Sequence, residues 1–598
     1  VEKTLRNLGL GDISDLKVGN ALQKTISGGQ RKRLNIGLEL LREPSVLFLD
    51  EPTSGLSSND SENIMDLLKE LSLKGKLIFV VIHQPSSDIF KMFDRLIILD
   101  IGGYQIYYGN PIEAVTYFKT LANLVNPDEG ICPNCGNVNP EQIFNIIETK
   151  VVDEYGRYTN QRKVSPVQWR KHYEDYSPQY ALDVNTEKPS STLKLPSRFR
   201  QLLIFARRDM LAKLSNTQYM VISLLEAPVL AFILSYIVRY YHVDHSIGKD
   251  SYIFGENINL PAYIFMSIIV SLFIGLTVSA EEIIKDAKIL KREAFLHLSR
   301  TSYLLSKIFI LFSFSLIQTI SYVLIGNWIL EIEGTNFYYV MVLFTTSCFA
   351  NMLGLNISST FNSVITIYIL IPIILIPQLI LGGIVVEFDD INPKLASENK
   401  VPLISELMTS RWAFEAIMVS QFKHNPFEKR FYRYDKQKAI SEYKRTYYIP
   451  ELETSLSYCM QHINSTDLGD RQMVEKNIRL LSLEVAKETR IRPHIPFTKV
   501  DRIHPDLFDI ELGQELADYL EALKNFYTRA YNRADQKLDK INKSLTLTDS
   551  LRKIYQASRA RYHNQTIEDM VTKTNEKNRI VEIDEKLIRK IYPVFHDP

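Results

Sequence analysis

Long apolar runs and densely charged sequence occupy different parts of this chain of 598 residues. Ile, Leu, Phe, Val and Tyr dominate from residue 218 to residue 386, whereas the sequence after residue 427 is rich in Lys, Arg, Glu and Asp. A change of composition on this scale indicates that parts of one chain face different solvents. The chain is therefore predicted to hold both membrane-embedded and water-soluble parts.

The apolar region contains stretches of about 20 residues, the length with which a helix crosses the hydrocarbon core of a bilayer. Five such spans are predicted, at residues 219–240, 258–280, 303–330, 337–358 and 365–386. A large soluble core is the alternative, but several nearly uncharged runs of this length in one part of a chain disfavour it. Pro372 and Pro377 predict a kink in the fifth span.

Basic residues orient these spans, because cytoplasmic connections carry an excess of Lys and Arg. The segment 198–216 before the first span is basic and amphipathic, which suits a helix lying at the membrane interface. The connection 281–300 is also basic, whereas the connection 331–336 has no Lys or Arg. We therefore expect the first two on the cytoplasmic side and the third outside.

Five spans that start inside leave the chain outside after about residue 387. Residues 427–598 show helical periodicity, for example over 512–545, with a break at 492–496. They are predicted to form a mainly helical, polar, extracytoplasmic domain. Helices this rich in Lys and Glu usually present solvated faces, and no enzyme site is recognised among them.

Overall charge and cysteine content exclude some functions. Lys and Arg number 70 against 69 Asp and Glu, a net charge of +1, so nothing indicates a nucleic-acid partner. The four cysteines are scattered over regions of different character, which disfavours a disulfide framework.

Three short motifs near the start of the chain indicate a phosphate-binding site. Ser27, Gly28, Gly29 and Gln30 precede the amphipathic run 34–41, so they are predicted to open a helix whose backbone N–H groups and positive dipole can hold phosphate. The apolar runs 46–49 and 77–82 are typical of parallel strands buried on both faces.

Ionisable side chains follow both predicted strands, at the sheet edge where such folds bind ligands. Asp50 is expected to hold the Mg²⁺ that bridges the phosphates, and Glu51 to orient or deprotonate the attacking water. His83 follows the second strand and can contact the γ-phosphate or the water.

Each motif also has an ordinary interpretation: a turn for the glycines, a helix start for the acidic pair, and a structural role for the histidine. Their order and spacing together resemble the ATPase domain of ABC transporters. The strings TISGGQRKRLNIGLELL, FLDEPTSGL and IHQPSSDIFKMFDRLIIL resemble the ABCG subfamily of half-transporters, as does LMTSRWAFEAIMVSQF at residues 407–422.

The resemblance implies a multidomain protein: an α/β P-loop NTPase part (residues 1–150), a connector (151–197), an all-α ABC-2-type transmembrane domain (198–426) and the polar domain (427–598). It implies that Ser27 to Gln30 form the ABC signature, that Asp50 and Glu51 form the Walker B pair, and that His83 is the switch histidine. ATP and Mg²⁺ are the implied cofactors.

The implied partner is a second half-transporter, identical or different, packed so that each signature meets the nucleotide of the other protomer. The implied activity is ATP-driven transport of an unidentified substrate, as an exporter, by a multi-pass protein of the plasma or inner membrane with a cytoplasmic ATPase domain. The alternative is an ABC-shaped membrane protein that signals or acts as a scaffold.

Two departures from the family pattern bear on activity. No G-x-x-x-x-G-K-[ST] phosphate loop occurs in the sequence, so the chain is expected to begin inside the ATPase domain and not to hydrolyse ATP alone. Ser57 stands where the family usually has an aspartate that couples the two ATPase sites. Asp60 is close enough in sequence to be a substitute.

Two cysteines carry a weaker metal hypothesis. Cys132 and Cys135 have the C-x-x-C spacing of half a zinc site, but no second pair follows. The alternative is a plain surface loop, because a loop at this place also fits the ABCG pattern.

The connection 281–300 is charged and helical in period. By resemblance, its residues Glu281, Glu282, Arg292 and Glu293 correspond to a helix that couples the ATPase domain to the membrane domain, and the alternative is a solvated loop. Glu226, inside the first span, is costly there unless it faces protein or water, so it lines a substrate path or pairs with a neighbouring helix.

Overall fold

The fold was determined as a computed structural model, which describes residues 1–16, 18–19, 25–41, 43–125, 137–176, 196–240, 242–244, 249–293, 298–388, 391–392, 401–583 and 585–596. The chain divides into two compact units, Val1–Lys194 and Leu195–Pro598. Each unit has its own buried core and is described separately.

The first unit mixes helices and short strands, as expected for an α/β domain. Its helices are α1 (Glu2–Asn7), α2 (Gly28–Leu40), α3 (Ser58–Leu73), α4 (Ser87–Lys91), α5 (Pro111–Leu121), α6 (Glu141–Ile147) and α7 (Pro166–Tyr176). Its strands are β1 (Val46–Asp50), β2 (Leu77–Val81), β3 (Leu96–Asp100), β4 (Tyr104–Gly109), β5 (Lys150–Val152) and β6 (Tyr158–Arg162). β1 pairs with β2 in parallel, and the other two pairs are antiparallel hairpins.

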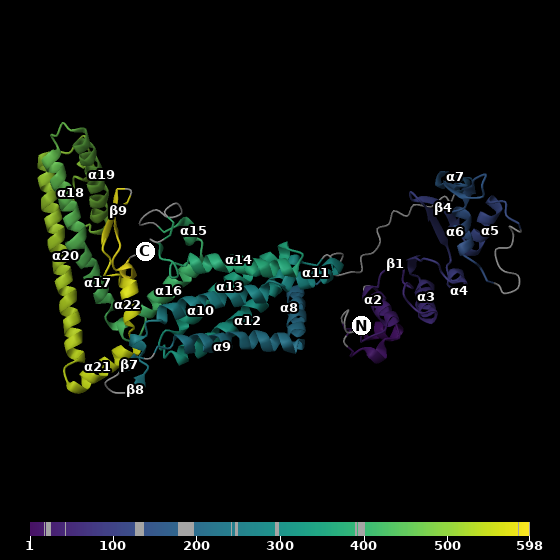
Figure 1. The fold of residues 1–598 in the computed structure, drawn as a ribbon, viewed down its shortest axis with the longest axis horizontal. Coiled ribbons are helices and arrows are strands. Elements are labelled where there is room, and N and C mark those ends of the chain that lie inside the picture. The colour runs from purple at the N-terminus through teal and green to yellow at the C-terminus, as the bar shows by residue number, and fades with distance from the viewer. Residues whose placement is uncertain are drawn as a thin grey trace. The chain divides into compact units, whose positions relative to one another are not determined.

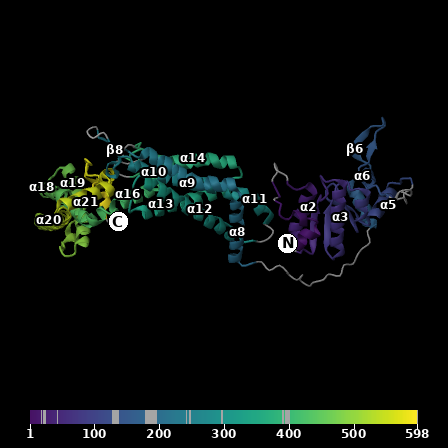
Figure 2. The ribbon, with the colours of Figure 1, turned by 90° about the horizontal axis from the view of Figure 1, so that it is seen from below.

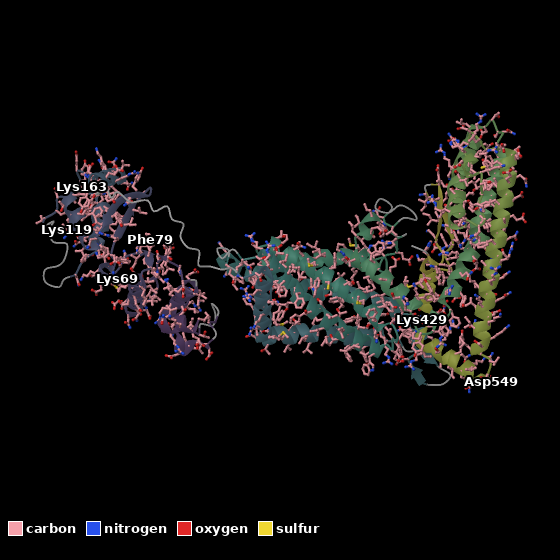
Figure 3. The ribbon with its side chains drawn as sticks, turned by 180° about the vertical axis from the view of Figure 1, so that it is seen from behind. Lys69, Phe79, Lys119, Lys163, Lys429 and Asp549 are labelled. Carbon is pink, nitrogen blue, oxygen red and sulfur yellow. The ribbon has the colours of Figure 1, made fainter. Side chains whose placement is uncertain are left out.

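The prediction that β1 and β2 are buried on both faces is wrong for the described residues. Leu47, Ile64 and Leu68 pack together on the face covered by α3. On the opposite face the rings of Phe48 and Phe79 stack with centroids 4.9 Å apart, and Phe48 is 76% exposed. Figure 3 marks Phe79 on this part of the unit. A parallel sheet needs a second covering layer, and the described chain supplies only one.

The second unit begins with a helical bundle in which the charged helices α8 (Arg198–Ser215) and α11 (Glu282–Glu293) accompany apolar helices (Figures 1 and 2). The apolar helices are α9 (Thr217–Val238), α10 (Leu260–Ser279), α12 (Arg300–Ile329), α13 (Asn336–Thr360) and α14 (Val364–Ile380). Among the described residues, four helices are long and apolar enough to cross a membrane, namely those that contain α9, α10, α12 and α13. The helix α14 is apolar but has only 17 residues, so the count of five spans stays a prediction.

Small residues let α10 and α13 approach closely. A Cβ on Gly275 would lie 2.8 Å from the carbonyl oxygen of Ser347, and one on Gly354 would overlap the side chain of Ser279. Close contact through Gly and Ser is the usual way in which apolar helices associate without a hydrophobic driving force between them.

Helices also dominate the rest of the unit. They are α15 (Leu403–Glu406), α16 (Thr409–Lys423), α17 (Tyr432–Tyr443), α18 (Ile449–His462), α19 (Leu468–Ile491), α20 (Ile510–Leu545), α21 (Asp549–Tyr562) and α22 (Gln565–Thr572). Two hairpins, β7 (His242–Asp244) with β8 (Lys249–Ser251) and β9 (Ile580–Ile583) with β10 (Lys586–Arg589), were not predicted. The long helix α20 runs beside α17 and α18 (Figure 1).

Candidate functional site

The Gly-rich motif opens a helix, as predicted. Ser27 is the N-cap of α2: its hydroxyl accepts a hydrogen bond from the Gln30 N–H at 3.1 Å, and the Gln30 side chain accepts one from the Ser27 N–H at 2.9 Å. This capping box fixes where the helix starts. The N–H groups of Gly28 and Gly29 lie in the first turn, where the helix dipole favours an anion.

Gly29 lies against the helix that follows β1. A Cβ at this position would be 2.8 Å from a carboxylate oxygen of Asp60, so a side chain here would require the Asp60 carboxylate to shift. Asp60 is held by Ser57, which caps α3 and donates its hydroxyl proton to the Asp60 carboxylate at 2.9 Å. Asp60 therefore reaches the Gly-rich motif at the start of α2, a contact that the sequence did not reveal.

The parallel register brings the predicted catalytic residues to one edge. Asp50 is the partner of Val81 in the ladder, and the Glu51 N–H donates to the Val81 carbonyl at 2.9 Å. His83 follows two residues later, so all three residues lie at the carboxyl ends of β1 and β2. Their side chains are exposed and free to meet a ligand.

Glu51 has a left-handed backbone, with φ of 44°. Non-glycine residues in this region are uncommon and are found often at functional sites. The Lys32 ammonium donates to the Glu51 carbonyl at 2.7 Å and so ties α2 to this turn. Sequence reasoning missed Lys32, although the basic run that follows the Gly-rich motif was visible.

These residues fit part of an ATP and Mg²⁺ site: exposed carboxylates at a strand edge for the cation, and helix N–H groups with a glycine cradle for phosphate. Cys132 and Cys135 lie outside the described residues, so the zinc hypothesis stays a prediction.

The predicted coupling residue Glu282 lies in a buried charge cluster of the second unit. The cluster comprises Asp209 and Lys213 of α8, Glu282 and Asp286 of α11, and Lys307 of α12. Glu282 accepts from the Lys213 ammonium at 2.6 Å and from the Lys307 ammonium at 3.0 Å. Lys307 also contacts Asp209 at 2.6 Å and Asp286 at 3.0 Å.

The charge cluster joins three helices, and both of its lysines are nearly buried. Burial opposes the charge of Asp209, but Lys213 and Lys307 hold the pKa of its carboxyl below the usual range. A second contact, from Arg208 to Glu293 at 2.7 Å, also joins α8 to α11. The three helices are therefore linked by charge as well as by packing.

The remaining coupling candidates differ in their surroundings. Glu281 pairs with Lys285 one turn along, at 2.5 Å. Arg292 belongs to α11, but its side chain is not among those described. Glu226, half-buried on α9, makes no ion pair within the described residues, so both interpretations of it stay open.

Known families match most of this architecture. Residues 1–54 match the family described as ABC transporter, and residues 83–194 and 200–422 match two families described as ABC-2 type transporter. The chain therefore carries an ABC-transporter ATPase segment joined to an ABC-2-type membrane domain.

Its relatives belong to the G group of these transporters. ABC transporter G family member 28 of Arabidopsis thaliana is 40% identical over 172 residues, which are 29% of this chain and 15% of that protein. Member 14 of the same organism is 34% identical over 204 residues, 32% of this chain and 31% of that protein. The Broad substrate specificity ATP-binding cassette transporter ABCG2 of Bos taurus is 42% identical over 127 residues, 21% and 19% of the two chains. The matched regions thus cover less than a third of each relative, and the relatives confirm the ABCG resemblance.

Proposed function

We propose that this chain is part of an ATP-driven transporter that exports a substrate across a membrane as a dimer of half-transporters. The observation that carries the proposal is the edge of the β1–β2 pair. There the register brings Asp50, Glu51 and His83 together. In the same unit, Ser27 caps the N-terminus of α2, where backbone N–H groups are available to an anion. The non-transporting alternative is not favoured by the relatives, which are transporters by name.

The residues of this edge divide the work of ATP hydrolysis. Mg²⁺, when bound, neutralises charge on the phosphates, and Asp50 is the residue placed to hold it. Glu51 orients the attacking water and His83 the γ-phosphate. Ser27 to Gln30 serve the nucleotide of the partner protomer. No G-x-x-x-x-G-K-[ST] motif occurs in these 598 residues, so we infer that they alone do not hydrolyse ATP.

The rest of the chain completes the proposal as follows. Residues 1–150 are ATPase, 151–197 connector, 198–426 membrane domain with five spans, and 427–598 an extracytoplasmic domain. The helix α11 transmits ATPase closure, and the charge cluster passes this motion to α8 and α12 together. The ATPase part is cytoplasmic, in a plasma or inner membrane.

The test is ATP hydrolysis by the full-length protein in lipid, compared with a Glu51→Gln variant. Removing the carboxylate that orients the water should lower kcat by about 100-fold or more, with ATP binding retained. The matched control is Glu70→Gln, an exposed glutamate of α3 whose side chain has one described contact, a surface pair with Lys74. Equal and negligible rates in the wild type and in Glu51→Gln would reject the proposal.

A further inference from the structure

Three segments meet at one end of the membrane bundle. They are the connection 252–257 before α10, the connection 330–335 before α13, and the segment 421–428, which comprises the end of α16 and the residues that follow it. The Tyr252 hydroxyl donates to the Leu330 carbonyl at 2.8 Å, and the Thr335 hydroxyl donates to the Gln421 side chain at 2.6 Å. These contacts already tie the three segments to one another.

The corner between α21 and α22, residues 560–564, lies on all three segments. The Asn564 side chain, 4% exposed, donates to the carbonyls of Phe254 at 2.8 Å and Asn257 at 3.0 Å. The Arg561 guanidinium contacts both carboxylate oxygens of Glu333, at 2.6 and 3.1 Å. One corner therefore holds two connections that are more than 70 residues apart in sequence.

The third anchor is an ion pair. The His563 ring lies 2.8 Å from the Glu428 carboxylate in the segment after α16. α22 also packs against α16 and α10. Figure 3 labels Lys429, next to Glu428, and Asp549, where α21 begins.

Backbone contact makes this fit tight at Gly255. A Cβ there would lie 3.0 Å from the His563 carbonyl oxygen and 3.2 Å from the Ala560 carbonyl oxygen. Backbone atoms cannot move aside as a flexible side chain can, so even one methyl group would push the corner away from the connection.

We propose that the α21–α22 corner is a latch that holds this end of the membrane bundle closed and must release when the helices separate. The step from holding to releasing rests on the proposed transport function, because a transporter has to open at this end. The hold itself rests only on the contacts described above. Residues 549–572 thus restrain the bundle from a part of the chain far from α10 and α13 in sequence.

Hydrogen exchange of the full-length protein in lipid nanodiscs tests the hold. Gly255→Ala places a methyl group against the His563 and Ala560 carbonyls. Asn564→Ala removes the side-chain hydrogen bonds to the Phe254 and Asn257 carbonyls. Each should speed amide exchange in residues 252–257 by about tenfold or more. The matched controls are Gly469→Ala, whose Cβ would meet only an Asp467 side chain, and Thr548→Ala, which removes a cap at the other end of α21.

Unchanged exchange in both Gly255→Ala and Asn564→Ala would overturn the latch. If Asn564→Ala does not fold, because Asn564 also caps α22, Gly255→Ala decides the question alone.

Adding ATP to a Glu51→Gln variant tests the release. The latch predicts faster exchange in residues 560–564 and 252–257 when nucleotide protects residues 27–30. Protection at residues 27–30 without any change at the corner would overturn the release. No protection at residues 27–30 would count against the proposed function instead, and the Gly255→Ala result would still decide the hold.

Discussion

His563 shows how a buried imidazole can be kept charged. Burial alone lowers its pKa, but contacts with Glu428 at 2.8 Å and Glu568 at 3.1 Å outweigh burial and raise the pKa to about 9. Asp435 also faces this group, and burial and the repulsion of Glu428 raise its pKa to about 7. The side chain is only 6% exposed, so solvent screens these interactions little.

We predict a pH-dependent loss of stability in His563→Gln. The folded pKa lies above the usual 6.5, so the stabilisation by His563 is complete below pH 6.5 and is lost as pH rises through 9. The free energies of unfolding of wild type and variant, measured by thermal unfolding, should differ by on the order of 2 kcal/mol at pH 6. The difference should vanish above pH 9.

Subtracting the two curves cancels most of the contribution of Asp435, which both proteins share. An exposed histidine substituted in the same way, His504→Gln, serves as the control. A His563→Gln difference that grew with pH would contradict this assignment of charge.

At single residues, the sequence predicted local structure and missed distant contacts. The helix start at Ser27 to Gln30 was predicted, whereas the capping box between Ser27 and Gln30 was not, although its S-x-x-Q spacing lies within one helical turn. Nothing in the sequence places Asp60 against Gly29, because that contact depends on how α3 packs on α2. The role of Ser57 as a cap became visible only with its helix.

At the scale of elements, the charge cluster links α8, α11 and α12 through ion pairs between particular side chains. We predict that Glu282→Gln destabilises the protein by about 3–5 kcal/mol, because it leaves two nearly buried lysines short of one carboxylate. Thermal unfolding in lipid nanodiscs measures this loss.

Two comparisons separate a buried charge from a surface one. Arg479→Ala breaks an exposed pair with Glu475 on α19 and should cost less than about 1 kcal/mol. Glu282→Leu combined with Lys307→Met should cost less than Glu282→Gln alone, since apolar groups can replace a buried pair. Similar losses for Glu282→Gln and Arg479→Ala would contradict the prediction.

Helices were predicted well because their periods are written in the sequence. α8, α11 and α20 all begin within about two residues of the predicted segments. The charge cluster escaped prediction because its members come from three helices as much as 98 residues apart. The open face of β1 and β2 escaped it because apolar strand sequence does not tell whether a second layer is present.

For the whole molecule, the proposed topology makes residues after about 387 accessible from outside. We predict that a cysteine at Leu507, which is 55% exposed, reacts with an impermeant maleimide added to intact cells. Cys132, Cys135 and the partly exposed Cys348 are first replaced by serine, while Cys459 is buried.

A cysteine at Lys74, exposed in the first unit, should react only after the cells are permeabilised. Labelling of the Leu507 position only from the cytoplasm would contradict the proposed topology. It would require an even number of spans before residue 387.

The stacked rings of Phe48 and Phe79 have a practical consequence for handling this protein. Phe48, Leu77 and Val81 are all more than half exposed, so the described part of the first unit has an apolar, uncovered sheet face. Such patches drive colloidal association of otherwise folded proteins. Expressed without the membrane helices, this unit is expected to aggregate. Dye-binding or light-scattering assays on the isolated unit would then report aggregation rather than nucleotide binding.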